Sequence, residues 1–185
     1  MKRRELLAAI AAAMAGFTGC SGGGTGSENR TTDSPSGVTP TSTPLSEFDC
    51  PPHDSAPNPA VCSHTVDTDT ASVYLLPSDT TVDVSTGTVD LTLYNYSSAE
   101  LEFNPYQWSI MKRKSAGWNP IEKRIAGDGR LTLAPGKTHS WTFEEVVDAI
   151  NERATVDAGT YTAGISVPSP ETSDWNRCIA LFRLV

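Results

Sequence analysis

The chain is short of positive charge, of long apolar runs and of catalytic motifs. Its 185 residues hold 14 Lys and Arg against 22 Asp and Glu, a formal net charge of −8. Because phosphate groups are held by clustered Lys and Arg, this balance argues against nucleic-acid binding. No apolar run approaches the roughly 18 residues that a membrane-spanning helix needs. With 3 His and neither a G-x-S-x-G nor an H-E-x-x-H motif, we expect no enzyme and no cofactor.

The first twenty residues have the layout of an export signal. Three basic residues follow Met1, an apolar stretch runs from Leu6 to Phe17, and Thr-Gly-Cys ends the segment at Cys20. The pair Arg3-Arg4 resembles a twin-arginine signal, and the residues before Cys20 resemble a lipobox, although Phe17 stands where Leu is usual. We therefore expect a signal peptide at 1–19 and a lipid on Cys20. The alternative is an ordinary signal peptide that holds a Cys.

The mature chain is expected to be strongly acidic. Cleavage before Cys20 removes three basic residues and one acidic residue, which leaves a charge of −10. Arg then outnumbers Lys by 7 to 4. An acidic, Lys-poor exported protein resembles haloarchaeal proteins, whose dense carboxylates keep the surface hydrated while salt screens their repulsion. The alternative is an acidic extracellular protein without adaptation to salt.

Residues 20–62 are expected to form a disordered tether. Of the 26 residues from Ser21 to Ser46, 20 are Ser, Thr, Gly or Pro. Such a segment buries too little apolar surface to offset its ordering entropy. Its random-coil reach is roughly 30 Å. Asn29 begins a glycosylation sequon, so the tether is either glycosylated there or a bare linker.

From about residue 63 the hydrophobic pattern changes to period two. Apolar and polar residues alternate at 89–93 and at 160–167, as in half-buried strands of an antiparallel sheet. Further strands are expected at 73–76, 81–84, 108–112, 118–121, 131–133, 140–143 and 178–185, separated by turn residues. One helix is expected at 144–152, where Val146, Val147 and Ile150 recur at helical spacing. Residues 63–185 therefore predict an all-β sandwich with one short helix.

Two details favour an immunoglobulin-like arrangement of this sandwich. Residues 157–161 read D-A-G-T-Y, the D-x-G-x-Y form of a tyrosine corner, in which the Tyr161 hydroxyl fastens a loop. Trp108 begins a strand at the point where such folds bury an indole. The inter-sheet disulfide of antibody domains is absent, because Ala163 stands two residues after Tyr161.

Short motifs follow one another in a recognisable order. The strand at 89–93 ends in N-Y-S-S at 95–98, and W-S-I-M-K-R at 108–113 and G-W at 117–118 follow. L-A-P-G-K at 133–137 and G-T-Y at 159–161 complete the series. Over residues 73–167 this order resembles immunoglobulin-like domains of exported bacterial and archaeal lipoproteins, including haloarchaeal ones. The strand–turn, L-x-P-G and G-T-Y elements also resemble proteinase-inhibitor domains of the BsuPI type.

Three cysteines remain if Cys20 carries lipid. In an oxidising compartment they predict one disulfide and one free thiol. We favour Cys62–Cys178, because the first and last strands of a sandwich are often neighbours. Cys50–Cys62 is the alternative.

A metal site at the same place is a weaker hypothesis. Cys50 and Cys62, with His53 and His64, supply the two Cys and two His of many zinc sites. Thiols outside the cytoplasm tend instead to form disulfides. We therefore expect no metal.

Aromatic residues gather in the sequence around one predicted hairpin. Tyr94, Tyr96 and Trp118 are expected to share an exposed edge, where aromatic rings can stack on sugars or contact a protein. Asn95 begins a second sequon, and a glycan on it would cover part of that edge.

These features together predict a lipoprotein on the extracellular face of the membrane. Its lipid would hold it to the membrane, and the sandwich would present a binding or structural module to an envelope protein or a glycan. One alternative is a proteinase inhibitor of the BsuPI-like type, acting through the Gly-containing loop 126–130. Another is an accessory lipoprotein of a membrane complex.

Overall fold

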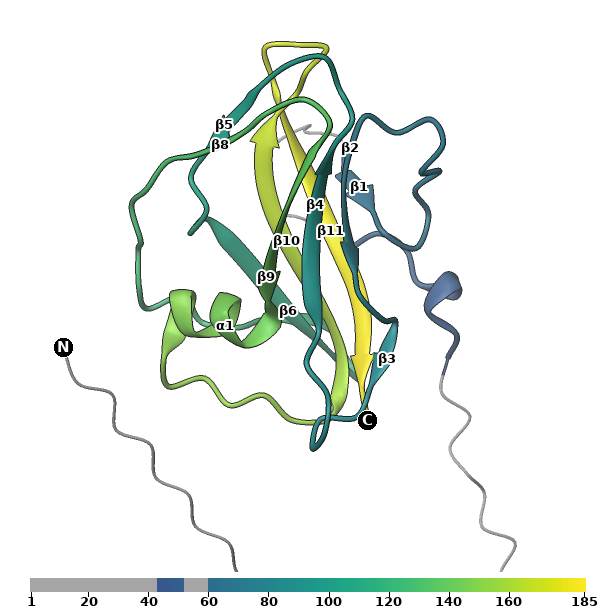
Figure 1. Cartoon of the computed structure of the whole chain (residues 1–185). Coiled ribbons are helices and arrows are strands. Elements are labelled where there is room, and N and C mark those ends of the chain that lie inside the picture. Colours follow the sequence, from purple (N-terminus) through teal and green to yellow (C-terminus); the bar gives the residue numbers. More distant parts are fainter. Residues whose placement is uncertain (1–42, 52–59) are drawn as a thin grey trace, which may run out of the picture. The chain divides into compact units, whose positions relative to one another are not determined.

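The computed structural model describes residues 43–51 and 60–185 (Figure 1). They form a mostly β structure with one α-helix, α1 (Phe143–Asn151), and a short 3-10 helix, η1 (Leu45–Glu47). The expected all-β class with one short helix is confirmed. The strands are β1 (Ala60–Cys62), β2 (Val73–Pro77), β3 (Thr81–Val82), β4 (Asp90–Asn95), β5 (Leu101–Phe103), β6 (Trp108–Lys114), β7 (Gly117–Pro120), β8 (Leu131–Leu133), β9 (Lys137–Thr142), β10 (Gly159–Pro168) and β11 (Trp175–Leu184).

These strands form three sheets. A six-stranded sheet has the order β1–β11–β10–β6–β7, with β3 also paired to β11. A three-stranded sheet has the order β2–β4–β9, and β5 pairs with β8. All pairs are antiparallel except those of β1 and β3 with β11, which are parallel.

The two larger sheets share one apolar core. Leu91 and Leu93 enter it from β4, and Ala163 and Ile165 enter it from β10. Helix α1 adds further buried side chains and lies beside β9 and β6 (Figure 1). At about 25 cal/mol per Å² of apolar surface, this shared burial is the main force that holds the layers together.

Helix α1 forms where the hydrophobic spacing predicts it. Its cap is a capping box in which the Thr142 side chain accepts from Glu145 N at 3.1 Å and the Glu145 carboxylate accepts from Thr142 N at 2.8 Å. This box ends β9 and starts the helix. Phe143, expected at the end of a strand, is therefore the first helical residue.

The predicted tyrosine corner is present. Tyr161 is fully buried in β10, and its hydroxyl donates to the Asp157 carbonyl oxygen at 2.8 Å. The same hydroxyl accepts from Asp157 N at 3.3 Å. Trp108 is 3% exposed, as expected for a buried indole. These contacts tie the loop before β10 to the core.

Strand β11 is buried on both faces. Cys178 and Phe182 face the shared core, whereas Ile179 and Leu181 face the other way and are no more than 1% exposed. The N-terminal strap, defined as residues 43–51, lies along this outer side of the six-stranded sheet. Arg183 of β11 donates to the Thr43 carbonyl oxygen of the strap.

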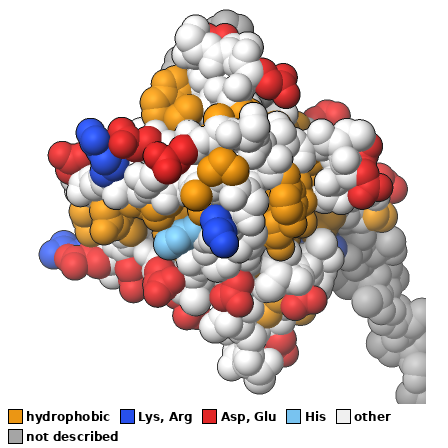
Figure 2. Space-filling model, turned by 45° about the horizontal axis from the view of Figure 1, so that its top comes forward, with side chains coloured by type: hydrophobic (Ala, Val, Ile, Leu, Met, Phe, Trp, Pro, Cys, Tyr) orange, Lys and Arg blue, Asp and Glu red, His pale blue; other side chains and the backbone are white. Residues whose placement is uncertain are grey.

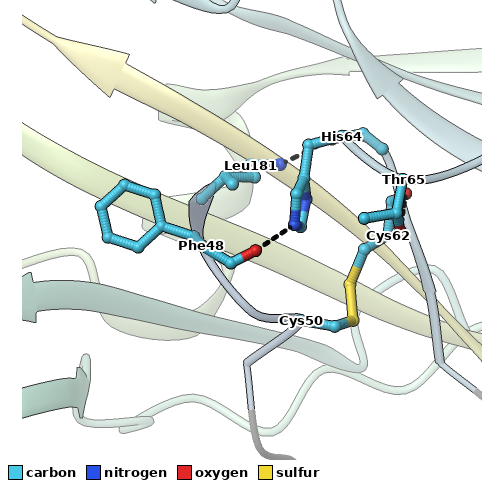
Figure 3. The surroundings of a disulfide bond; sticks show 7 residues. Phe48, Cys50, Cys62, His64, Thr65 and Leu181 are labelled. Atoms are coloured by element: carbon cyan, nitrogen blue, oxygen red, sulfur yellow. Dashed lines mark hydrogen bonds between the residues drawn. A yellow bond between two sulfur atoms is a disulfide. The ribbon is translucent and has the colours of Figure 1, made fainter. Parts of the chain in front are cut away.

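The strap is held by a disulfide and a histidine (Figure 3). Cys50 is bonded to Cys62 at the end of β1, and His64 Nε2 lies 2.7 Å from the Phe48 carbonyl oxygen. In Figure 3 the Phe48 ring points away from the disulfide while its carbonyl points toward His64. The two cysteines of the hypothetical zinc site, Cys50 and Cys62, are thus joined in a disulfide.

The structure corrects the favoured disulfide pairing. Cys62–Cys178 is wrong, and the alternative, Cys50–Cys62, is present, while Cys178 is a buried free thiol. The reason is register: in the parallel pairing of β1 with β11, Cys62 lies opposite Ile179, and Val61 lies opposite Cys178. Since neighbouring strand residues point to opposite faces, the two sulfurs lie on opposite sides of the sheet.

The ordered structure also begins earlier than residue 63, where we placed the domain. Of the residues that we assigned to the tether, β1 is an edge strand of the six-stranded sheet, and residues 43–51 are joined to that sheet by the hydrogen bond from Arg183 to Thr43. Strands β1 and β5 were not expected; each has three residues, as β8 has, but β8 is marked in the sequence by the turn residues on either side of it. In the described ranges, no helix is both long enough and apolar enough to cross a membrane.

Candidate functional site

The three aromatic residues expected on one edge lie on two different sheets. Tyr94 is in β4 and Tyr96 follows it, on the three-stranded sheet, whereas Trp118 is in β7, the last strand of the six-stranded sheet. The chain changes sheets between β4 and β6, so closeness in sequence did not become closeness in space. The single edge is replaced by two separate aromatic sites.

The first site is the tyrosine surface, which consists of Tyr74, Tyr94 and Tyr96. Tyr74 of β2 pairs directly with Tyr94 of β4, and their rings stack with centroids 4.9 Å apart. Tyr96 lies two residues after Tyr94, with its ring centroid 5.9 Å from that of Tyr94 and 6.0 Å from that of Tyr74. Tyr74 was missed in the sequence because it lies twenty residues before its partner, and only strand pairing joins them.

Exposure increases steeply across the tyrosine surface. Tyr74 is 4% exposed, Tyr94 is partly buried, and Tyr96 is 58% exposed. Two packed rings therefore support a third that is open to solvent. A tyrosine ring supported in this way offers contact area at low entropic cost.

The tyrosine surface is rich in hydroxyl groups, and the Asp69 carboxylate lies close enough to affect it. Burial raises the pKa of Tyr74 above its ordinary value, and the neighbouring Tyr96, Tyr94 and Asp69 raise it further. On the adjoining strands, the hydroxyls of Thr92 and Ser140 lie 2.8 Å apart. Figure 2 shows, on one face of the molecule, patches of hydrophobic side chains among scattered Asp and Glu.

The second site is a groove beside Trp118. Its wall on β6 and β7 includes Arg113 and Trp118, and its opposite wall is the strap with Phe48. The rings of Phe48 and Trp118 lie 5.9 Å apart at an angle of 59°. We call this the Trp118 groove; its volume is about 480 Å³, and it is lined by Glu47, Phe48, Asp49, Cys50, Arg113, Ala116, Gly117 and Trp118.

Asn95, expected as a glycan acceptor, is fully buried. Its Nδ2 donates to the carbonyl oxygens of Ala99 and Leu133, each at 2.9 Å. Its Oδ1 accepts from Ser97 N at 3.1 Å and from Ser97 Oγ at 2.6 Å. Because Nδ2 is the atom that would carry the sugar, the folded domain offers no acceptor at this sequon. Asn29 and Cys20 lie outside the described residues.

Loop 126–130, the region expected to inhibit a protease, lies against Tyr106. A Cβ placed at Gly127 would come within 2.6 Å of the Tyr106 side chain, and one at Gly129 within 2.7 Å. Asn104 Nδ2 also donates to the Gly127 carbonyl oxygen at 3.2 Å. A side chain at either position would therefore force the Tyr106 ring to move. Within residues 43–51 and 60–185, no cluster of His, Cys, Asp and Glu is arranged to hold a metal ion.

Comparison with known proteins identifies no family. No protein-family description and no curated protein matches the chain. Among solved structures, the Pseudomonas fluorescens alkylpurine DNA glycosylase AlkC bound to DNA containing an abasic site analog is 13% identical, with a TM-score of 0.30 over 62% of this chain and 31% of that one. The β-glucosidase EmGH1 of Erythrobacter marinus is 16% identical, with a TM-score of 0.30 over 60% of this chain and 15% of that one. A Listeria innocua β-glucosidase in complex with gluconolactone is 16% identical, with a TM-score of 0.25 over 61% and 16%.

These likenesses are partial on both sides. The chain spans under a third of the length of each of these structures. At such TM-scores, the likeness carries no argument about fold or function. The case for function therefore depends on the residues themselves.

Proposed function

We propose that this protein is a lipid-anchored, extracytoplasmic binding module that contacts an envelope protein through the tyrosine surface. The anchor is supported by the first twenty residues, where a basic start, an apolar stretch and Cys20 follow in the order of a lipoprotein signal. The binding role is supported by one observation: Tyr96 is 58% exposed on top of two packed tyrosine rings.

That observation favours protein binding for energetic reasons. Tyr is enriched among residues that dominate protein interfaces, because it buries a large apolar ring and keeps a hydroxyl for hydrogen bonds. The Tyr96 ring packs against the rings of Tyr74 and Tyr94. Little side-chain conformational entropy is therefore lost when a partner covers Tyr96. The net negative charge of the chain favours a partner with a basic or neutral contact surface.

We further propose that the module is immunoglobulin-like. The strand order β11–β10–β6–β7 has the form of the G-F-C-C′ sheet, and β2–β4–β9 has the form of A-B-E. The parallel pairing of β3 with β11, the tyrosine corner at Tyr161 and the buried Trp108 support the same assignment.

The binding role is tested by crosslinking the full chain in its own membranes at high salt and identifying the captured protein. Tyr96→Ala should abolish capture, whereas Trp175→Ala should leave it unchanged. Trp175 is the matched control, because it is 43% exposed and lies in β11, on the other sheet. Capture that survives Tyr96→Ala, with folding intact, contradicts the proposed contact.

The same material tests the two alternatives. Stoichiometric inhibition of an extracellular protease, lost when loop 126–130 is replaced, would favour the inhibitor. Co-purification with every subunit of one membrane complex would favour the accessory lipoprotein.

The anchor is tested by Cys20→Ser. The variant should be released from membranes or remain as an uncleaved precursor, because the lipid would have no sulfur to join. A variant that fractionates with membranes at mature size would show that the anchor assignment is wrong.

A further inference from the structure

The Trp118 groove combines an apolar wall with charges of both signs. Phe48 comes from the strap and Trp118 from β7, and the groove between the strap and the β6–β7 hairpin measures about 480 Å³. Glu47 and Asp49 flank Phe48 along the strap, and Arg113 approaches from β6. This set is separate from the tyrosine surface and lies on the other sheet.

The aromatic part of the groove is a pair of angled rings. The Phe48 and Trp118 centroids are 5.9 Å apart and the ring planes meet at 59°. Arg113 lies against both, with its Cζ 5.8 Å from the Phe48 centroid and 5.6 Å from the Trp118 centroid. Cation–π attraction therefore positions the guanidinium, which keeps its N–H donors for another partner.

The charged side chains of the groove do not neutralise one another. Glu47, Asp49 and Arg113 are all exposed. Across the described ranges, the ion pairs join Lys112 to Asp157, Arg124 to Glu122 and Arg130 to Glu102, and none of the three groove residues takes part. The groove thus offers two carboxylates as acceptors and one guanidinium as a donor to whatever enters it.

This combination selects a class of ligand. The two carboxylates repel phosphates and other polyanions, and the Arg113 guanidinium already occupies the cation position against the two rings. The exposed rim gives no enclosed cavity for an aliphatic chain. A neutral molecule with hydroxyls around an apolar C–H face can interact with all of these groups. Its hydroxyls donate to the carboxylates and accept from the guanidinium, and its C–H face packs on an aromatic ring. A pyranose ring has this form, and we infer that the Trp118 groove is a saccharide-binding site.

The strap makes the site dependent on the disulfide. Glu47, Phe48 and Asp49 are joined to the sheet through Cys50–Cys62, and the Phe48 carbonyl oxygen lies 2.7 Å from His64 Nε2 (Figure 3). A wall fixed before binding costs less entropy when the ligand arrives. Reducing the Cys50–Cys62 disulfide should therefore weaken saccharide binding, although the charged and aromatic side chains of the groove are unchanged.

The test uses the full chain with four neutral trisaccharides as probes: maltotriose, cellotriose, mannotriose and chitotriose. Binding is measured by calorimetry and by tryptophan fluorescence. At least one probe should bind with a Kd on the order of 1 mM. Trp118→Ala should weaken it by about tenfold, as expected when an aromatic contact of about 1.4 kcal/mol is lost.

A second variant keeps the test independent of folding. Glu47→Gln with Asp49→Asn retains the shape of the strap and should weaken binding at least about threefold, since neutral amides accept hydrogen bonds less strongly than carboxylates. Cys50→Ser should weaken it by at least as much. Trp175→Ala is the control, because its ring is 43% exposed in β11 and does not line the groove. It should change the Kd by less than about twofold, because effects of distant sites are independent.

The outcomes separate this site from the proposed protein contact. Failure of all four probes to bind at 10-fold above the expected Kd, or binding unchanged by Trp118→Ala and by the strap variants, overturns the saccharide site. Saccharide binding lost with Tyr96→Ala and kept with Trp118→Ala would also overturn it, by moving the site to the tyrosine surface. Capture of the envelope protein is tested separately, with Tyr96→Ala, so either proposal can be refuted without the other.

Discussion

Asn95 is the residue at which the sequence pattern and the structure disagree most directly. The sequon marks it as a surface acceptor, whereas the structure buries it completely and gives its amide four hydrogen bonds. Through these bonds Asn95 joins the end of β4 to the turn at Ser97 and Ala99 and to Leu133 of β8. We therefore predict that Asn95→Ala destabilises the folded domain and that the loss has no connection with a glycan.

The magnitude follows from the four bonds. Removing the amide leaves two carbonyl oxygens without a donor and two Ser97 donors without an acceptor. At about 0.5–1.5 kcal/mol each, and with water reaching some of the groups in the turn, the free energy of unfolding should fall by about 2–4 kcal/mol. For a domain of this size the melting temperature should fall by roughly 10 °C.

Ser97→Ala is the matched control, because it destroys the same sequon and leaves the Asn95 amide bonded to Ala99 and Leu133. It should cost about 1 kcal/mol. Both variants would be made in the native host and in a host without N-glycosylation, and unfolded in urea while tryptophan fluorescence is followed. Equal losses for the two variants, seen only in the native host, would refute the reasoning. So would a glycopeptide at Asn95 from folded protein.

Four further predictions concern stability and the thiols. Tyr161→Phe should lower the free energy of unfolding, measured by urea titration, by about 1–2 kcal/mol, because the buried hydrogen bond to the Asp157 carbonyl oxygen is lost. Tyr106→Phe is the control: its ring is exposed, and the free energy of unfolding should change by less than about 0.5 kcal/mol. Burial raises the pKa of Cys178 to about 12, so the native thiol should resist alkylation at pH 8 and react only after unfolding. Because the folded pKa is raised, the contribution of this thiol to stability is complete below the unfolded pKa of about 8.5 and is lost as the pH rises toward 12. Relative to Cys178→Ala, the free energy of unfolding should fall by about 2.5 kcal/mol between pH 8 and 10.5. Non-reduced peptide mapping should recover Cys50 linked to Cys62, and reduction should cost about 3 kcal/mol in the loop-entropy model; a Cys62–Cys178 peptide would contradict the register described here.

Features that depend on neighbouring residues could be predicted from the sequence. The alternation in β4 and β10, the helical spacing in α1 and the D-x-G-x-Y corner each involve residues within a few positions of one another. Local geometry decides them, so the printed order of residues is enough.

Features that depend on strand partners were decided only by the tertiary structure. Cys62 and Cys178 are close in space, yet a shift of one position in the β1–β11 register puts them on opposite faces. Trp118 lies on a different sheet from Tyr94, because the chain changes sheets between them. Tyr74 lies beside Tyr94, because β2 pairs with β4. A sequence states which residues follow one another, and these contacts depend instead on which strands meet and in what register, which the packing of the whole core selects.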